Sequence, residues 1–110
     1  MEKVAVFYSK AVQLYFDELI QTLFKQDYFI YEENAIEYVQ KLVYYIEDSI
    51  KIKPHKKSSK SLLKYGDFYF FYQSNARTTW YIFFSKKESI YIIKYISNNH
   101  IFDAKFINQL

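Results

Sequence analysis

The hydrophobic period of this chain changes halfway along its length, and that change limits the folds it can adopt. In residues 10–26, and again in residues 34–50, apolar side chains recur at every third or fourth position, the spacing of one face of a helix. After Pro54 the chain instead carries short runs rich in Tyr, Phe, Ile and Thr, which prefer strands. The sequence therefore predicts helices first and a sheet second. The expected strands are Phe68–Gln73, Arg77–Phe84 and Ser89–Ile96.

Capping signals bound the two expected helices. Ser9 directly precedes the first helix and is a preferred N-cap residue. Asn34 is followed three residues later by Glu37, which has the form of a capping box for the second helix. A hinge at residues 27–33 then joins the helices into an antiparallel hairpin. Residues 4–7, Val-Ala-Val-Phe, are a short strand candidate ahead of the first helix.

Short links between the expected strands predict how they pair. Ser74–Ala76 and Ser85–Glu88 are expected turns, and the single glycine, Gly66, marks the turn into the first of the three strands. Strands joined by such short links pair antiparallel, in a meander. We therefore predict one α+β domain over residues 1–110, with an N-terminal helical hairpin packed on an antiparallel β-sheet. Residues 101–110 form a C-terminal tail, and the sheet face away from the helices is covered by this tail, a partner or a ligand.

Several function classes are excluded by what the chain lacks. It has no cysteine, which removes disulfides, thiolate catalysis and cysteine zinc sites. A single glycine leaves no glycine-rich phosphate loop. The N-terminus has an early charge and no long apolar stretch, and no later apolar run approaches the roughly 20 residues of a membrane span. We expect a cytoplasmic protein, with no membrane association and no metal ion or cofactor.

Charge is divided unequally between the two halves of the chain. Residues 1–50 hold nine acids and four lysines, a balance of −5, whereas residues 51–110 hold eleven basic residues and three acids, a balance of +8. A basic half that is also rich in aromatic residues suits a polyanion with flat bases, or an acidic protein partner. An uneven but merely solvated surface is the alternative interpretation.

Most of this positive charge is concentrated in residues 51–64, which contain six lysines and no acid. This segment is predicted to be an exposed loop, which either attracts a nucleic-acid backbone without reading its sequence or only makes the protein soluble. Trp80, Tyr81 and Tyr95 could stack on bases, although each is more often a core residue. The lysines are Lys51, Lys53, Lys56, Lys57, Lys60 and Lys64.

Arg77 and His100 are the candidate chemical groups. Arginine binds a phosphate through two hydrogen bonds, and histidine transfers protons near neutral pH. Because Arg77 opens one expected strand and His100 follows the next, antiparallel pairing places them near one edge of the sheet. Together they suit metal-free cleavage of RNA, whose 2′-hydroxyl is a built-in nucleophile. A solvated arginine and a surface or capping histidine are the alternatives.

The order of the elements, the lysine segment and two motifs resemble one family. The motifs are Arg-Thr-Thr-Trp-Tyr-Ile-Phe-Phe at residues 77–84 and Tyr-Ile-Ser-Asn-Asn-His at residues 95–100. Over residues 4–100 the chain resembles the RelE/ParE superfamily of bacterial toxins, most of all its Bacteroidetes-type branch. The resemblance implies a toxin of a type II toxin–antitoxin system, whose basic face binds an acidic antitoxin protein.

This resemblance leaves three functions open. RelE-like members cut mRNA in the ribosomal decoding site by attack of the 2′-hydroxyl on the neighbouring phosphate, and ParE-like members instead poison DNA gyrase. The third possibility is a non-catalytic module that only binds its antitoxin. Arg77 and His100 favour the ribosome-dependent mRNA endonuclease.

The resemblance also assigns roles to individual residues. Arg77 corresponds to the arginine that contacts the scissile phosphate, and His100 to the acid or base near the end of the last strand. Where some members place a general-base carboxylate, this chain offers only Asp67. The predicted RNA-binding residues are Lys53, Lys56, Lys57, Lys60, Lys64 and Asn99.

Overall fold

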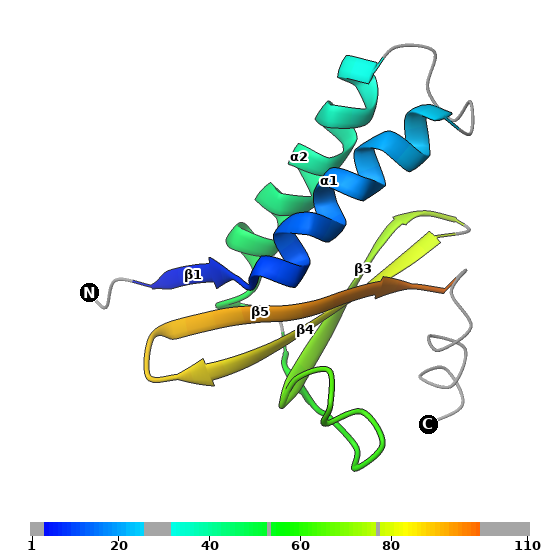
Figure 1. The fold of residues 1–110 in the computed structure, drawn as a ribbon. Coiled ribbons are helices and arrows are strands. Elements are labelled where there is room, and N and C mark those ends of the chain that lie inside the picture. The colour runs from blue at the N-terminus through cyan, green and yellow to red at the C-terminus, as the bar shows by residue number, and fades with distance from the viewer. Residues whose placement is uncertain (1–3, 26–31, 53, 77, 100–110) are drawn as a thin grey trace.

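A computed structural model describes residues 4–25, 32–52, 54–76 and 78–99 of the chain. In this part of the chain two helices lie on one side of a five-stranded mixed sheet, as Figure 1 shows. The predicted α+β class is therefore confirmed. The elements are β1 (Ala5–Tyr8), α1 (Lys10–Lys25), α2 (Glu32–Ser49), β2 (Lys56–Lys57), β3 (Phe68–Asn75), β4 (Thr78–Lys87) and β5 (Ile90–Asn98).

The strands are arranged in the order β1-β5-β4-β3-β2. The meander of β3, β4 and β5 is antiparallel, as predicted. However, β1 pairs in parallel with β5, with Phe7 opposite Ile92, so the prediction of a wholly antiparallel sheet was wrong. Two helices and three strands separate β1 from β5 along the chain, so no tight turn between them imposes an antiparallel pairing.

The hairpin between β4 and β5 is longer than the sequence indicated. The expected turn at Ser85–Glu88 lies mostly within β4, and Lys87 pairs directly with Ile90. Glu88, in the resulting two-residue turn, has a φ of 56°. The polar character of Ser85–Lys87 is typical of a turn. In the structure, however, these residues pair with β5 and belong to the strand.

Local signals placed the first helix better than the second. The backbone N–H of Val12 donates to Ser9 Oγ at 3.2 Å, which confirms Ser9 as the cap of α1. Asn34 lies inside α2, which begins at Glu32, so the capping-box prediction was wrong. Acidic residues are favourable in the first turn of a helix, and Glu32 and Glu33 therefore allow the helix to begin before Asn34.

The main core lies between the helices and the sheet. Apolar side chains of α2 at helical spacing pack against alternate residues of β4, among them Trp80, Ile82 and Phe84. Fully burying each side chain of this size stabilises the fold by about 1.5–3 kcal/mol. The buried members of this cluster are Val12, Leu42, Ile46, Ile50, Phe70, Trp80, Ile82, Phe84, Tyr91, Ile93 and Ile96. Neither described helix is both long enough and apolar enough to cross a membrane.

His55 belongs to the structural framework at the end of α2. Its ring nitrogen Nε2 hydrogen-bonds the carbonyl oxygen of Ile50. The same imidazole packs edge-on against Phe84, with ring centroids 4.7 Å apart, and lies 5.9 Å from the ring of Tyr91. This histidine therefore helps to end the helix and to fill the core.

A second, smaller core covers the opposite face of the sheet. Leu62 packs with Tyr81 and Phe83, and Tyr65, Tyr69 and Tyr95 surround these three residues. Leu62 and Tyr65 lie in the loop after β2, which hangs below the sheet in Figure 1. The prediction that residues 51–64 form a simple exposed loop was therefore wrong in part, because this segment also supplies β2 and the buried Leu62.

Gly66 is required for close packing rather than for a turn conformation. Its φ is not positive, so the expected turn does not explain it. A Cβ built at Gly66 would lie 2.8 Å from the backbone nitrogen of Phe84 and 3.1 Å from its carbonyl oxygen. Backbone atoms in a central strand cannot move aside easily, so a side chain at position 66 would force the segment off the sheet.

We expect Gly66→Ala to lower the free energy of unfolding by about 1–3 kcal/mol, the usual effect of overpacking a close contact. Urea denaturation followed by the fluorescence of Trp80 measures this change. Ser61→Ala, at an exposed position of the same segment, is the control and should leave the midpoint unchanged. Equal midpoints for both variants would contradict the proposed close approach.

Candidate nucleic-acid interface

The beginning of β4 and the end of β5 are joined by two hydrogen bonds. The backbone N–H of Asn99 donates to the carbonyl oxygen of Thr79 at 3.1 Å, and the Thr79 N–H donates to Asn99 Oδ1 at 3.0 Å. Thr79, two positions after Arg77, and Asn99, directly before His100, thus lie side by side. Arg77, His100 and Lys53 themselves lie outside the described residues, and their predicted roles stay predictions.

Asn99 has a structural function that its motif did not indicate. Its side-chain oxygen accepts a hydrogen bond from the backbone of Thr79, where the ladder between the two strands ends. The Asn99 side-chain oxygen takes the place of a backbone carbonyl as the acceptor for the Thr79 N–H, and so holds the two strand ends together. The predicted role of Asn99 in binding RNA would therefore come in addition to this structural one.

The predicted RNA-binding lysines that the structure describes are all exposed, namely Lys56, Lys57, Lys60 and Lys64. Two of them lie over aromatic rings, with Lys56 Nζ 5.0 Å from the ring centroid of Phe71 and Lys64 Nζ 5.0 Å from that of Tyr65. Such cation–π contacts contribute about 0.5–1 kcal/mol at exposed sites. The ammonium groups are thereby held near the face of the sheet that lies away from the helices.

Asp67, the one carboxylate considered as a general base, is exposed at the end of this segment. Its backbone carbonyl accepts a hydrogen bond from the N–H of Ser58 at 2.9 Å, which closes the base of the loop. Asp67 directly precedes β3, whose first residue, Phe68, pairs with Phe84. The paired strand ends lie at the other end of β4, so the structure does not bring Asp67 together with Thr79 and Asn99.

Apolar residues in and next to the lysine segment pack against β4 and β5. Leu62 packs on Tyr81, which is two residues from Thr79 along β4. Tyr65 stacks on Tyr95 of β5, with ring centroids 4.4 Å apart and an interplanar angle of 23°. The lysine segment therefore lies on the outer face of the sheet, against the middle of β4 and β5.

The acidic helical half and the basic half of the sequence lie in different layers of the fold. The acidic side chains of α1 and α2 are exposed on the helical layer, whereas the lysine segment lies on the other side of the sheet. A polyanion approaching the lysine segment would meet four exposed lysines and one exposed carboxylate, that of Asp67. The exposed acids of the described helices are Asp17, Glu18, Glu33, Glu37, Glu47 and Asp48.

The aromatic residues suggested for base stacking are mostly core residues. Trp80 is 3% exposed and Tyr81 is 4% exposed, while Tyr95 is half-buried against Tyr65. Sequence reasoning missed Phe71, which is 40% exposed on the outer face of β3 beside Lys56. The alternation of strand residues could have found it, because Phe71 follows the buried Phe70 and must face the other way.

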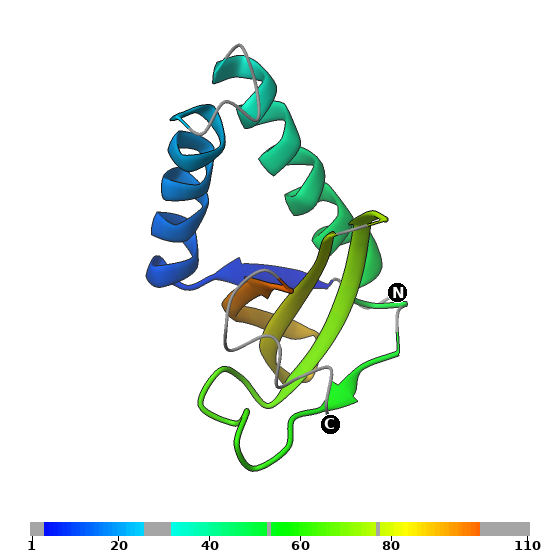
Figure 2. The same ribbon diagram turned by 90° about the vertical axis from the view of Figure 1, so that its right-hand side faces the viewer.

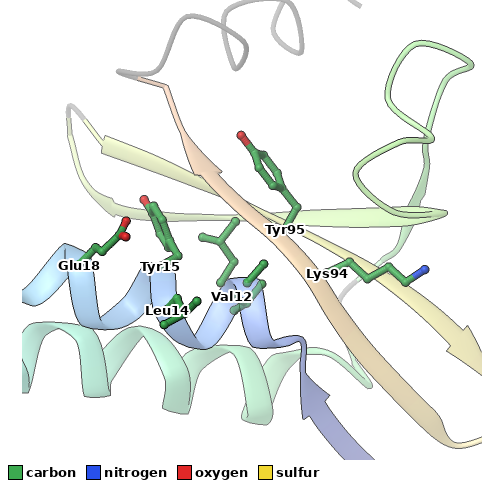
Figure 3. A pocket seen from close by; sticks show the side chains of 8 residues that line it. Val12, Leu14, Tyr15, Glu18, Lys94 and Tyr95 are labelled. Atoms are coloured by element: carbon green, nitrogen blue, oxygen red, sulfur yellow. The ribbon is translucent and has the colours of Figure 1, made fainter.

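A groove of about 340 Å³ runs between α1 and β5, as Figure 3 shows. Tyr15 lies in it, and burial, followed by the effects of Tyr95 and Tyr38, raises the pKa of Tyr15 to about 12. Tyr15 is therefore neutral at physiological pH and cannot act there as a base. The groove residues are Ala11, Val12, Leu14, Tyr15, Glu18, Lys94, Tyr95 and Ile96.

Comparison with protein-family models, with curated proteins and with solved structures finds no match to this chain. The site described here is thus built from the residues of this chain alone. It consists of the paired strand ends at Thr79 and Asn99 and, farther along the sheet, the four exposed lysines of its outer face.

The raised pKa of Tyr15 predicts a loss of stability in alkali. Unfolded tyrosine releases its proton near pH 10, whereas folded Tyr15 keeps it to about pH 12. The contribution of the protonated Tyr15 hydroxyl to the free energy of unfolding is fully present below pH 10. It is lost as the pH rises toward 12, because in this range the unfolded state is stabilised by releasing the proton and the folded state is not. Urea denaturation from pH 9 to 12 should therefore show a shallower decline for Tyr15→Phe than for the wild type. Tyr44→Phe, at a ring 62% exposed, is the control, and equal declines in all three proteins would contradict the prediction.

Proposed function

We propose that this protein is the toxin of a type II toxin–antitoxin system, of the RelE/ParE kind, and that it cuts mRNA on the ribosome. The observation that carries the proposal is the pairing of Thr79 with Asn99 at one end of a sheet whose outer face also carries the exposed lysine segment. Arg77 lies two positions before Thr79 and His100 directly follows Asn99, within the two motifs that resemble the family. The α+β class and the segregated charge further support the proposal.

The proposed reaction needs no group beyond the RNA and this chain. The 2′-oxygen attacks the neighbouring phosphorus, the bond from phosphorus to the 5′-oxygen breaks, and a 2′,3′-cyclic phosphate and a 5′-hydroxyl result. His100 exchanges a proton with the 2′-hydroxyl or the leaving 5′-oxygen. Arg77 stabilises the negative charge that develops on the phosphoryl oxygens. Both groups act on atoms of the scissile phosphate.

The lysines have a separate role in this proposal, which is to bind RNA and not to cleave it. Lys56, Lys57, Lys60 and Lys64 attract the phosphate backbone of RNA without reading bases. The same positive face would bind the acidic antitoxin, so that inhibition and RNA binding exclude each other. Codon preference would then come from the ribosome and from the residues around the scissile bond.

We expect Arg77→Ala and His100→Gln each to slow cleavage by about 100-fold or more, the usual contribution of such groups. The measurement uses mRNA bound to bacterial ribosomes, with the new RNA ends mapped by primer extension. Arg77→Lys keeps the charge but loses two-point phosphate binding, and it should restore only part of the activity.

The other outcomes distinguish the remaining functions. Normal cleavage by both Arg77→Ala and His100→Gln would show that the catalytic residues are wrongly assigned. An uncut message with the wild-type protein would reject the nuclease. A supercoiling assay with DNA gyrase would then separate a ParE-like inhibitor, which stops the reaction, from a module that only binds its antitoxin.

The lysine segment makes a separate prediction about salt. Lys60→Gln combined with Lys64→Gln should reduce the slope of log affinity against log salt by about 1.4 for single-stranded RNA, or about 0.7 for each lost contact. Fluorescence anisotropy with a labelled RNA measures the slope. Lys86→Gln combined with Lys87→Gln removes the same charge at the tip of the β4–β5 hairpin and should change it little. Equal slopes for the two double variants would indicate that only net charge matters.

A further inference from the structure

One hydroxyl of α2 connects the helical layer to the ends of two strands. The indole Nε1–H of Trp80 in β4 donates to the Tyr38 hydroxyl at 3.2 Å. The hydroxyls of Tyr38 and Ser74 in β3 share a second hydrogen bond, also of 3.2 Å. The rings of Tyr38 and Trp80 lie 6.5 Å apart at 54°, so the hydroxyl contacts come with ring packing. Tyr38 therefore holds β3 and β4 at once.

These contacts fall where the backbone ladder between β3 and β4 is irregular. Gln73 pairs with Thr79 and Asn75 with Thr78, so the register shifts at Ser74. An irregularity of this kind disrupts the hydrogen bonds between strands locally, and it leaves the strand ends less constrained by their own backbone. Figure 2 shows these ends rising beside α2. The Tyr38 hydroxyl thus supplies a link that the ladder lacks at this point.

The link extends to the third strand of the meander. Trp80, which donates to Tyr38, is adjacent to Thr79, and the Thr79 N–H is bound by Asn99 Oδ1. A displacement of the beginning of β4 would therefore also displace the end of β5. The Tyr38 hydroxyl is thus connected, through Trp80 and Thr79, to both strand ends of the candidate site.

We propose that Tyr38 is a positioning residue for RNA cleavage, which fixes the ends of β3, β4 and β5 relative to the helical layer. This inference rests on the proposed function and adds a residue to it. Tyr38 carries no charge and makes its hydrogen bonds to the protein, so it acts on the orientation of the site and leaves the attraction of RNA unchanged. A displacement of about 1 Å at a reacting centre is enough to slow a reaction by about 100-fold.

The test is Tyr38→Phe, which removes only the hydroxyl and keeps the ring. Cleavage of ribosome-bound mRNA is measured over a range of protein concentrations. We expect the maximal rate to fall by about 10-fold or more, while the concentration for half-maximal rate stays at the wild-type value. Ser74→Ala removes one of the two hydroxyl contacts, and its rate should fall in the same direction by a smaller factor.

Tyr8→Phe is the matched control. The Tyr8 hydroxyl donates to Glu47 Oε1 at 3.0 Å and joins β1 to α2 near the other end of that helix. Burial and this carboxylate raise the pKa of Tyr8 well above its usual range. We therefore expect Tyr8→Phe, like Tyr38→Phe, to lower the free energy of unfolding measured in urea. Unlike Tyr38→Phe, it should leave the maximal cleavage rate unchanged.

A second measurement follows the contact itself. Trp80 is the only tryptophan, so its indole N–H gives one assignable signal, whose hydrogen exchange should become faster in Tyr38→Phe and stay unchanged in Tyr8→Phe. Wild-type cleavage and exchange rates in Tyr38→Phe would overturn the inference, as would equal losses of cleavage in both variants. A wild-type protein that leaves the message intact would instead overturn the proposed function, and this role of Tyr38 with it.

Discussion

The burial of β4 on both of its faces is the constraint on which the rest of the structure depends. Trp80, Ile82 and Phe84 face the helices, and Tyr81 and Phe83 face the segment after β2. A strand buried on both faces needs a layer on each side, because large aromatic side chains are costly to leave in water. The central strand therefore holds the helical hairpin on one side and the lysine segment on the other.

This arrangement explains how a polar site is built on an apolar framework. Leu62 and Tyr65 fix the lysine segment to the outer face of the sheet, where the neighbouring ammonium groups remain exposed. Gly66 allows the segment to approach the backbone of Phe84. Tyr38 contributes from the opposite layer by binding Trp80. The proposed chemistry of the strand ends thus depends on packing contacts that carry no charge.

Sequence patterns correctly predicted the elements that are stabilised by residues close to one another along the chain. The helical spacing of apolar residues and the cap at Ser9 located α1 correctly, because both depend on neighbours along the chain. Asn34 failed as a cap because the preceding glutamates also favour a helix. Gly66 was assigned to a turn, since its contact partner Phe84 is distant in sequence. The parallel pairing of β1 was missed for the same reason, because a four-residue strand carries no signal of its direction.

The order of helices and strands, the antiparallel meander and the concentration of lysines between residues 51 and 64 can all be predicted from the amino-acid sequence. These features follow from side-chain periodicity, short links and charge, which are properties of neighbouring residues. Three features emerge only in the folded protein: this segment folds back over the sheet, Asn99 binds the backbone of Thr79, and Tyr38 joins α2 to Trp80. Such contacts join residues 20 to 42 positions apart, and they form only when packing of the whole core brings the elements together.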